Sequence, residues 1–286
     1  LALPVAIAQV GAMSMGLVDT FMVGRLGAVE LAAVALGDAC FFTLQVLAMG
    51  VIMALGPLVS QAHGAGDPQR CAAAWRTGLR LALVMTLPLV ALVFAIGPAL
   101  RWIGGIDPRV VQTSMDYLAP RTLGVLPHLI YVACRALLNG KGDTRPAMVV
   151  TLIAVVMNAF LDWVFIFGNL GAPALGVAGS GLVTALCRGF MCIGLLVWLK
   201  RPAYRAYTKG AQVSRALFVK VFRLGVPIGL THALEVGAFA ASSIYMGWIG
   251  VTALAAHQIA LKMATASFML AISLGIATGI RVGNGI

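Results

Sequence analysis

Apolar runs about 20 residues long recur along the whole chain, and they limit its fold more than any other feature. A run of that length spans the ~30 Å hydrocarbon core of a bilayer as an α-helix. A closed β-barrel would instead show alternating segments of about ten residues. The 286 residues are 61% hydrophobic and 10% charged, whereas a soluble domain carries roughly 25% charged residues. The sequence therefore predicts an all-α polytopic membrane protein.

Turn signals divide the apolar runs into about eight predicted helices. Glycine-rich turns such as GRLG, HGAGDP and NGKGDTRP interrupt the runs, and a basic stretch follows residue 199. The predicted helices span residues 1–23, 31–62, 73–100, 112–139, 146–168, 175–199, 215–247 and 252–281.

The distribution of basic residues predicts the orientation of the chain. The net charge of +11 would suggest a nucleic-acid partner in a soluble protein, but here we expect none. Cytoplasmic loops of membrane proteins are rich in Lys and Arg, so the loops after helices two, four and six should face the cytoplasm. We therefore expect helix one to start on the cytoplasmic side of the cell (inner) membrane. The basic residues in these loops are Arg70, Arg76, Lys141, Arg145, Lys200, Arg201, Arg205 and Lys209.

The sequence also repeats itself at a shift of 223 residues. Pro4 then aligns with Pro227 and Gly24 with Gly247, and seven further identities follow at the same shift. The seventh helix thus restarts the first, so the repeat is six helices long, and an even number keeps both copies in one orientation. Parallel repeats of this kind are typical of transporters. We predict a first six-helix bundle with the start of a linker over residues 1–205, and the first two helices of a second bundle over 206–286.

Because the second copy stops after two helices, we expect an intact protein of about twelve helices of which this chain is a fragment. The chain also begins inside an apolar run without Met, so we expect an N-terminal piece to be missing.

Four acidic residues lie inside the apolar runs. An ionised carboxylate at the centre of a membrane helix costs at least ~2.5–3.5 kcal/mol, and such a residue normally faces a bundle interior or a water-filled cavity. The default interpretation is therefore functional. The four residues are Asp19, Asp38, Asp162 and Glu235.

Three of these acids should lie at a similar depth. Asp19 precedes Gly24 by five residues, and Asp162 precedes Gly168 by six. At 1.5 Å per residue, both lie about 8–9 Å below the predicted outer ends of their helices. Asp38, seven residues into the second helix, has a similar depth and is an additional candidate, although a residue so near the outer turn can also reach water.

Two neutral polar residues join this layer. Asn158 lies one helical turn before Asp162 and on the same face, and Thr184 in the sixth helix is slightly deeper. Carboxylate, amide and hydroxyl oxygens suit a hard cation such as Na⁺, or a proton shared between carboxylates. Two structural alternatives stay open: Asn158 tying two helices together, and Thr184 bonding to its own backbone.

Glu235 differs in position, because it precedes Gly247 by twelve residues and so should lie near the bilayer midplane. The cost of a charge is greatest there. Pro227 and nearby glycines precede it, and a proline leaves an unpaired carbonyl and a hinge.

The sequence does not favour an enzyme. It contains no H-E-x-x-H, no G-x-S-x-G and no phosphate-binding glycine loop. The GKGD string at residues 140–143 matches an intramembrane aspartyl protease motif, but it lies in a short basic turn with no second acid at that depth. Without a nucleotide site or a cofactor motif, we expect no cofactor, and an ion gradient as the energy source.

Several motifs together resemble the multidrug and toxic compound extrusion (MATE) transporters. These are GLVDTFMVGRLG, KGDTRPAM, MNAFLDWVFIFG, GAPALGVAGSGLVTAL, RLGVPIGLTHALE, ALAAHQIAL and GIRVGN, and the likeness covers essentially the whole chain. Members of the family have two six-helix bundles and export amphipathic, often cationic drugs in exchange for Na⁺ or H⁺.

The resemblance assigns roles to individual residues. It implies that Asp19, Asn158, Asp162 and Thr184 form a cation site in the first bundle, and that Glu235 is a coupling acid in the second. Because the sequence contains both the first-bundle site and Glu235, it does not indicate which bundle couples to the ion. Asp38 has no counterpart in the family pattern.

The predicted function is secondary antiport, in which organic cations are exchanged for Na⁺ or H⁺. We expect the protein to be a monomer whose other partners are membrane lipids. The first alternative is a flippase for a lipid-linked precursor, which would need mid-depth cations such as Arg135, Arg188 and Lys262. A membrane-embedded enzyme is a less favoured alternative.

Overall fold

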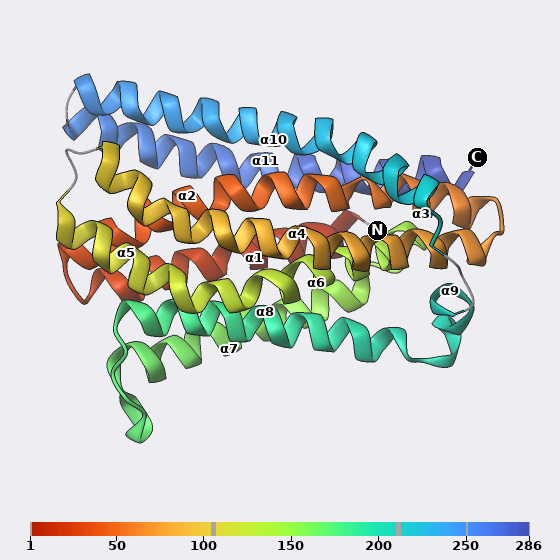
Figure 1. Ribbon diagram of the computed structural model, residues 1–286, viewed down its shortest axis with the longest axis horizontal. Helices are drawn as coiled ribbons and strands as arrows, with labels where there is room; N and C mark the ends of the chain where they lie inside the picture. The colour runs from red at the N-terminus through yellow and green to blue at the C-terminus, as the bar shows by residue number, and fades with distance from the viewer. Residues whose placement is uncertain (1, 104–106, 210–212, 250, 286) are drawn as a thin grey trace.

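The chain folds into long helices that run side by side along one axis (Figure 1). The computed structural model describes residues 2–103, 107–209, 213–249 and 251–285, and these residues form helices and turns without a strand. The α-helices are α1 Ala2–Gly24, α2 Ala28–Met53, α3 Leu55–Gly64, α4 Pro68–Ile103, α5 Pro108–Arg121, α6 Val125–Gly140, α7 Arg145–Phe167, α8 Val177–Leu199, α9 Arg205–Thr208, α10 Arg215–Ile249 and α11 Val251–Gly285. Three short 3₁₀ segments accompany them: η1 Thr122–Gly124, η2 Asn169–Gly171 and η3 Pro202–Tyr204.

This architecture confirms the prediction of an all-α multi-pass membrane protein. Within the described residues, seven helical segments are long and apolar enough to cross a bilayer, counting α2–α3 and α5–α6 as one segment each. The eighth predicted helix is present as α11 but is not among the seven, and the side chains of much of its first half lie outside the described residues.

Two predicted helices are interrupted in the structure. The second breaks at Ala54, between α2 and α3. The fourth tightens into η1 two residues after Pro120. At this bend the backbone of Gly124 approaches α8 so closely that an added Cβ would lie 2.9 Å from Ala185 Cα.

Helices α4 and α5 start at local capping signals. Asp107 accepts a hydrogen bond of 2.8 Å from the backbone N–H of Arg109, with Pro108 at the first helical position of α5. Asp67 does the same for the N–H of Arg70 at 2.9 Å, so α4 begins before the predicted residue 73. Such caps satisfy the N–H groups that a helix start leaves unpaired.

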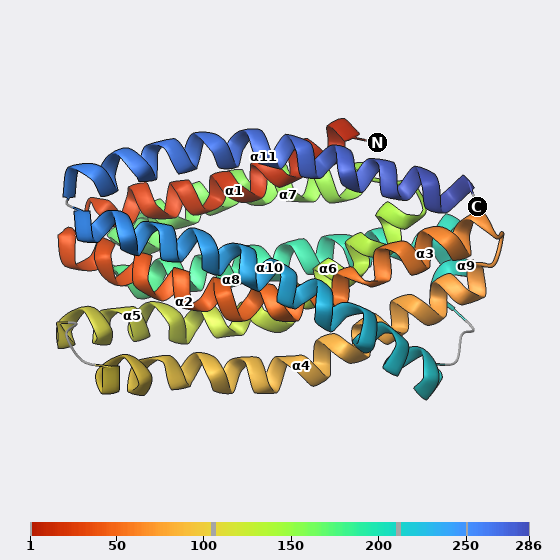
Figure 2. The same ribbon diagram turned by 90° about the horizontal axis from the view of Figure 1, so that it is seen from above.

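The packing of the helices brings distant parts of the sequence together. Helix α1 lies beside α7 and α11, whereas α4 and α5 lie along the opposite side of the molecule (Figure 2). Helix α10 packs against α2, where a Cβ on Gly50 would collide with the backbone of Gly229. Contact between small residues of this kind lets two membrane helices approach closely.

The segment after α8 is held against the first six predicted helices. The ammonium group of Lys141 lies 4.4 Å from the ring centroids of both Tyr204 and Tyr207, and the Tyr204 hydroxyl donates a hydrogen bond to Asp143. The predicted division after residue 205 thus falls within α9, which packs on α4.

Candidate cation-binding site

Four of the predicted site residues meet in the interior between three packed helices. Asp19 comes from α1, Asn158 and Asp162 come from α7, and Thr184 comes from α8. Helix α7 packs against both α1 and α8. Asn158 and Asp162 are fully buried, while Asp19 and Thr184 are 7% and 6% exposed. All four lie within about two and a half turns of one end of their helices, at about the same level along the bundle.

Asp19 is the hydrogen-bonding centre of this group. Asn158 Nδ2 donates to Asp19 Oδ1 at 2.9 Å, and Thr184 Oγ1 donates to Asp19 Oδ2 at 3.2 Å. The Thr184 hydroxyl also lies 3.0 Å from the carbonyl oxygen of Ser180. A hydroxyl has one proton, so this donor is divided between the carboxylate and its own helix, and both sequence alternatives for Thr184 and Asn158 have a structural basis.

Several oxygen atoms beside Asp19 are buried without a hydrogen-bond partner. They are both carboxylate oxygens of Asp162, the amide oxygen of Asn158 and the hydroxyl oxygen of Ser180. Asp162 also lies within direct interaction distance of Asp19. Buried polar groups are almost always paired, and a buried unpaired charge is costly. The carboxylate and amide oxygens can only accept hydrogen bonds, so this part of the cluster suits a bound cation, a proton or a water molecule.

The donor set indicates which cation fits. Carboxylate, amide and hydroxyl oxygens bind hard cations, whereas Zn²⁺ and similar ions prefer imidazole and thiolate ligands. In the described part of the chain no three His, Cys, Asp or Glu side chains come together as a metal-binding group. The oxygens around Asp19 thus suit Na⁺, or a proton carried by one carboxyl group of the Asp19–Asp162 pair.

Asp38 is not brought into this group. Its side chain is 51% exposed and forms an ion pair of 2.6 Å with Arg121, whose own side chain is 11% exposed. The guanidinium of Arg121 also lies over the ring of Phe41, 4.5 Å from its centroid. The predicted depth of Asp38 on α2 did not determine its direction, and its charge is balanced by Arg121.

Glu235 also lies apart from the four-residue group. It is on α10, and its carboxylate Oε2 lies 3.4 Å from Nδ1 of His232 one turn earlier. The side chains of Glu235 and His232 are 36% and 39% exposed. Helix α10 packs against α2 and α11 and, less extensively, against α4. Two separate acidic positions are thus available to a coupling ion.

The structure adds two features that sequence reasoning did not assign to the site. One is Ser180, which precedes Thr184 by one turn and contributes a buried free hydroxyl. The other is an Arg188–His128 pair, in which Arg188 Nη1 lies 2.9 Å from His128 Nδ1. Since arginine can only donate, His128 accepts through Nδ1 and is neutral in this pair. Arg188 follows Thr184 by one turn, a spacing that could have pointed to this position.

Comparison with known proteins places the fold. Solved structures that the chain resembles include "Crystal structure of eukaryotic MATE transporter AtDTX14", with a TM-score of 0.88 at 20% identity over 99% of this chain and 63% of that one. Another is "Outward-facing conformation of a multidrug resistance MATE family transporter of the MOP superfamily", with a TM-score of 0.84 at 19% identity over 100% and 64%. At these identities the likeness shows the shared fold.

Sequence relatives are closer. The chain is 35% identical to "Probable multidrug resistance protein NorM" of Mannheimia succiniciproducens, over 99% of this chain and 62% of that protein. It is 33% identical to "Multidrug resistance protein NorM" of Vibrio cholerae, over 99% and 63%. The chain thus spans less than two thirds of the length of these relatives. The MatE family model matches residues 4–164 and 227–286, which include the α1 and α7 site residues and Glu235, and the chain belongs to the MatE family.

Proposed function

We propose that this chain forms the cation-coupled part of a secondary antiporter that exports amphipathic organic cations in exchange for Na⁺ or H⁺. The observation that carries the proposal is the buried cluster of unpaired oxygens on Asp162 and Asn158 beside Asp19. An intramembrane acid marks an ion or substrate pathway by default. The names of the relatives, multidrug resistance proteins, support export of drugs as the task.

The exchange follows from competition for the same charge. A Na⁺ ion or proton that reaches Asp19 and Asp162 cancels part of their negative charge, and the pair then attracts an organic cation less strongly. Releasing the ion restores the charge and favours the next organic cation. Such negative coupling is reciprocal, because each ligand weakens the other by the same factor. Glu235 is proposed as a second coupling acid, acting from α10.

The direct test is transport by the full-length protein in sealed vesicles. Ethidium, a permanently charged planar cation, is loaded, and its efflux is followed by fluorescence under an imposed Na⁺ gradient or an imposed pH gradient. We expect one gradient to drive efflux and Asp19→Asn to abolish it, whereas Asp38→Asn should leave it intact. Undiminished exchange in Asp19→Asn would reject the role of this site.

A flippase for a lipid-linked precursor is the second candidate, and one observation supports it. Arg188 lies inside the first bundle beside His128, and Arg135 donates to Gln9 Oε1 at 3.2 Å, so cationic groups for a pyrophosphate are available. The side chain of Lys262 lies outside the described residues. The Arg188→Gln variant separates the two candidates, because it should stop pyrophosphate-lipid transfer but leave ethidium efflux in place.

The remaining expectations are part of the same proposal. The relatives are named multidrug resistance proteins, which supports transport over catalysis. We propose a monomer in the inner membrane, with the start of α1 on the cytoplasmic side and the predicted two-bundle division near residue 205.

A further inference from the structure

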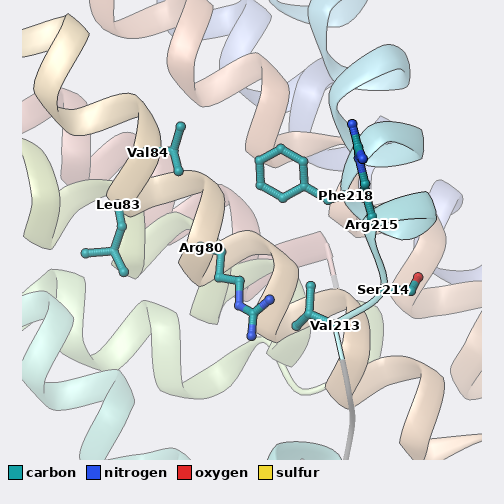
Figure 3. A pocket seen from close by; sticks show the side chains of 7 residues that line it. All are labelled: Arg80, Leu83, Val84, Val213, Ser214, Arg215 and Phe218. Carbon is teal, nitrogen blue, oxygen red and sulfur yellow. The ribbon is translucent and has the colours of Figure 1, made fainter.

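A cavity opens between α4 and the first turns of α10, away from the carboxylate site (Figure 3). Its volume is about 410 Å³. Arg80, Leu83 and Val84 of α4 line one side, and Arg215 and Phe218 of α10 line the other. A second cavity of about 560 Å³ adjoins it through Arg215 and is lined by Ala216, Val219, Lys220 and Arg223.

The level of this cavity in the membrane follows from the charges on α4. Residues 81–100 contain no charged side chain, and Arg80 and Arg101 bracket them. Twenty helical residues span about 30 Å, the thickness of the hydrocarbon core. Arg80 therefore lies at one boundary of that core, which is the cytoplasmic one in the predicted orientation. The leaflet next to it is the one whose anionic lipids attract basic segments.

The four basic side chains around the two cavities have no acidic neighbour among the lining residues. In the part of the chain that the structure describes, no hydrogen bond or ion pair is formed by the side chains of Arg80, Arg215, Lys220 or Arg223. Their positive charges are thus not offset by an acidic group among the described residues that line the two cavities.

The apolar side of the cavity fits the rest of such a ligand. Leu83 and Val84 are 56% and 60% exposed, and they lie one turn beyond Arg80 in the direction of the hydrocarbon core. Phe218 extends from α10 toward the side of the cavity on which Val84 lies (Figure 3). The basic side chains lie at the boundary of the hydrocarbon core, and the apolar side chains lie within the core. This arrangement matches a lipid, in which a phosphate headgroup is joined to an acyl chain. A free phosphate ion would use only the basic side chains.

We propose that this cavity binds an anionic phospholipid of the cytoplasmic leaflet. The phosphate is held by the guanidinium groups of Arg80 and Arg215, which suit phosphate geometry; these side chains extend apart in Figure 3 and turn toward the bound phosphate. An acyl chain lies against Leu83, Val84 and Phe218. Because α4 belongs to the first predicted bundle and α10 opens the second, the lipid bridges the two. The inference does not depend on what the protein transports.

Native mass spectrometry of the full-length protein tests this without a transport assay. The purified protein is mixed with phosphatidylglycerol or phosphatidylcholine, and retained lipid is counted. We expect phosphatidylglycerol to be retained about tenfold more, and Arg80→Gln with Arg215→Gln to remove most of that difference. The variant with Arg80→Lys and Arg215→Lys keeps both charges and should keep a large part of the difference between the two lipids. Its result therefore separates an effect of lost charge from an effect of misfolding.

A matched control pair lies at the opposite boundary, with Arg101 at the far end of α4 and Arg109 at the start of α5. Arg101→Gln with Arg109→Gln removes the same number of charges near the opposite boundary and should leave the retained lipid unchanged. Equal retention of the two lipids by the natural protein would overturn the proposal. So would an equal loss in the control variant, or full displacement of the lipid by millimolar inorganic phosphate, which would indicate a simple anion site.

Discussion

At the scale of single residues, the carboxylate of Asp162 is the least satisfied polar group of the site, since both oxygens are buried without a hydrogen-bond partner. We expect Asp162→Asn to raise the thermal unfolding midpoint measured without Na⁺ at neutral pH, because it removes that charge. It should also abolish the rise that Na⁺ or acid gives the natural protein. A ligand at about 100 times its Kd stabilises by ~2.7 kcal/mol, so this rise is on the order of 5 °C.

Differential scanning fluorimetry in detergent measures both effects. Asp38→Asn is the control, because Arg121 already neutralises Asp38, and it should retain the full rise. If Asp162→Asn responds to Na⁺ and acid as the natural protein does, Asp162 does not bind the coupling ion.

Thr184 allows a second test at this scale. Its hydroxyl is the only described donor to Asp19 Oδ2, and Thr184→Val removes it at nearly constant volume. A hydrogen bond to a charged group contributes ~1.5–3 kcal/mol, so we expect the Na⁺ or proton affinity to change at least tenfold, with Thr184→Ser restoring it. Thr20→Val, which removes an exposed hydroxyl bonded to Gly16 O on the same helix as Asp19, should have no effect in the same titration.

The residue scale also shows what the sequence could predict about the site. Helix depth brought Asp19, Asn158, Asp162 and Thr184 to one level, and the structure packs them together. Helix depth could not predict the direction in which the Asp38 side chain points. Helix α2 is apolar nearly all round, so its rotation about its own axis depends on packing such as that of Gly37 against Tyr117 and Leu118. Nor could helix depth reveal which oxygens lack partners, which depends on distances between three helices.

At the scale of helices, the crossing of α2 and α10 depends on glycine. A Cβ on Gly50 would meet the backbone of Gly229 at a separation that real side chains do not show. Backbone atoms cannot rotate away, so Gly50→Ala should lower the free energy of unfolding by about 1–3 kcal/mol, the usual cost of overpacking. Gly237→Ala on α10, where an added Cβ meets nothing within 4 Å, should be neutral or slightly stabilising. Equal unfolding midpoints for the two variants would contradict this packing.

Helix boundaries illustrate a limit of sequence reasoning at this scale. Pro88, Pro98 and Pro227 lie inside continuous helices, whereas the chain bends into η1 just after Pro120. Prolines are tolerated in membrane helices when neighbours satisfy the freed backbone groups, so a proline alone does not predict a break. The bend is fixed by contact of Gly124 with Ala185 on α8, which no local pattern reveals.

At the scale of the whole molecule, the far end of α11 packs against α3 and α6. A Cβ on Gly64 of α3 would lie 2.8 Å from the carbonyl oxygen of Gly283. The amide of Asn284, in the orientation that satisfies its neighbours, donates to the carbonyl oxygens of Ser60 and Gly140, both at 2.9 Å. These contacts join α11 to both α3 and α6 at the predicted cytoplasmic end, where the proposed function requires an opening for the exported molecule.

We therefore expect Asn284→Ala to loosen this end alone. Losing two hydrogen bonds that contribute ~1 kcal/mol each should speed hydrogen exchange of the amides near Ser60 and Gly64 about tenfold or more, as read by mass spectrometry of the full-length protein. The amides around Asp19 should exchange as before. Gln112→Ala, which breaks the hydrogen bond from Arg101 at the opposite end, should leave hydrogen exchange of residues 60–64 unchanged.

In an antiporter, Na⁺ or H⁺ and the organic cation should also shift the hydrogen exchange at this end in opposite directions, because each ligand favours access from the side where it is taken up. Identical shifts with both ligands would mean that this contact does not report the alternating step.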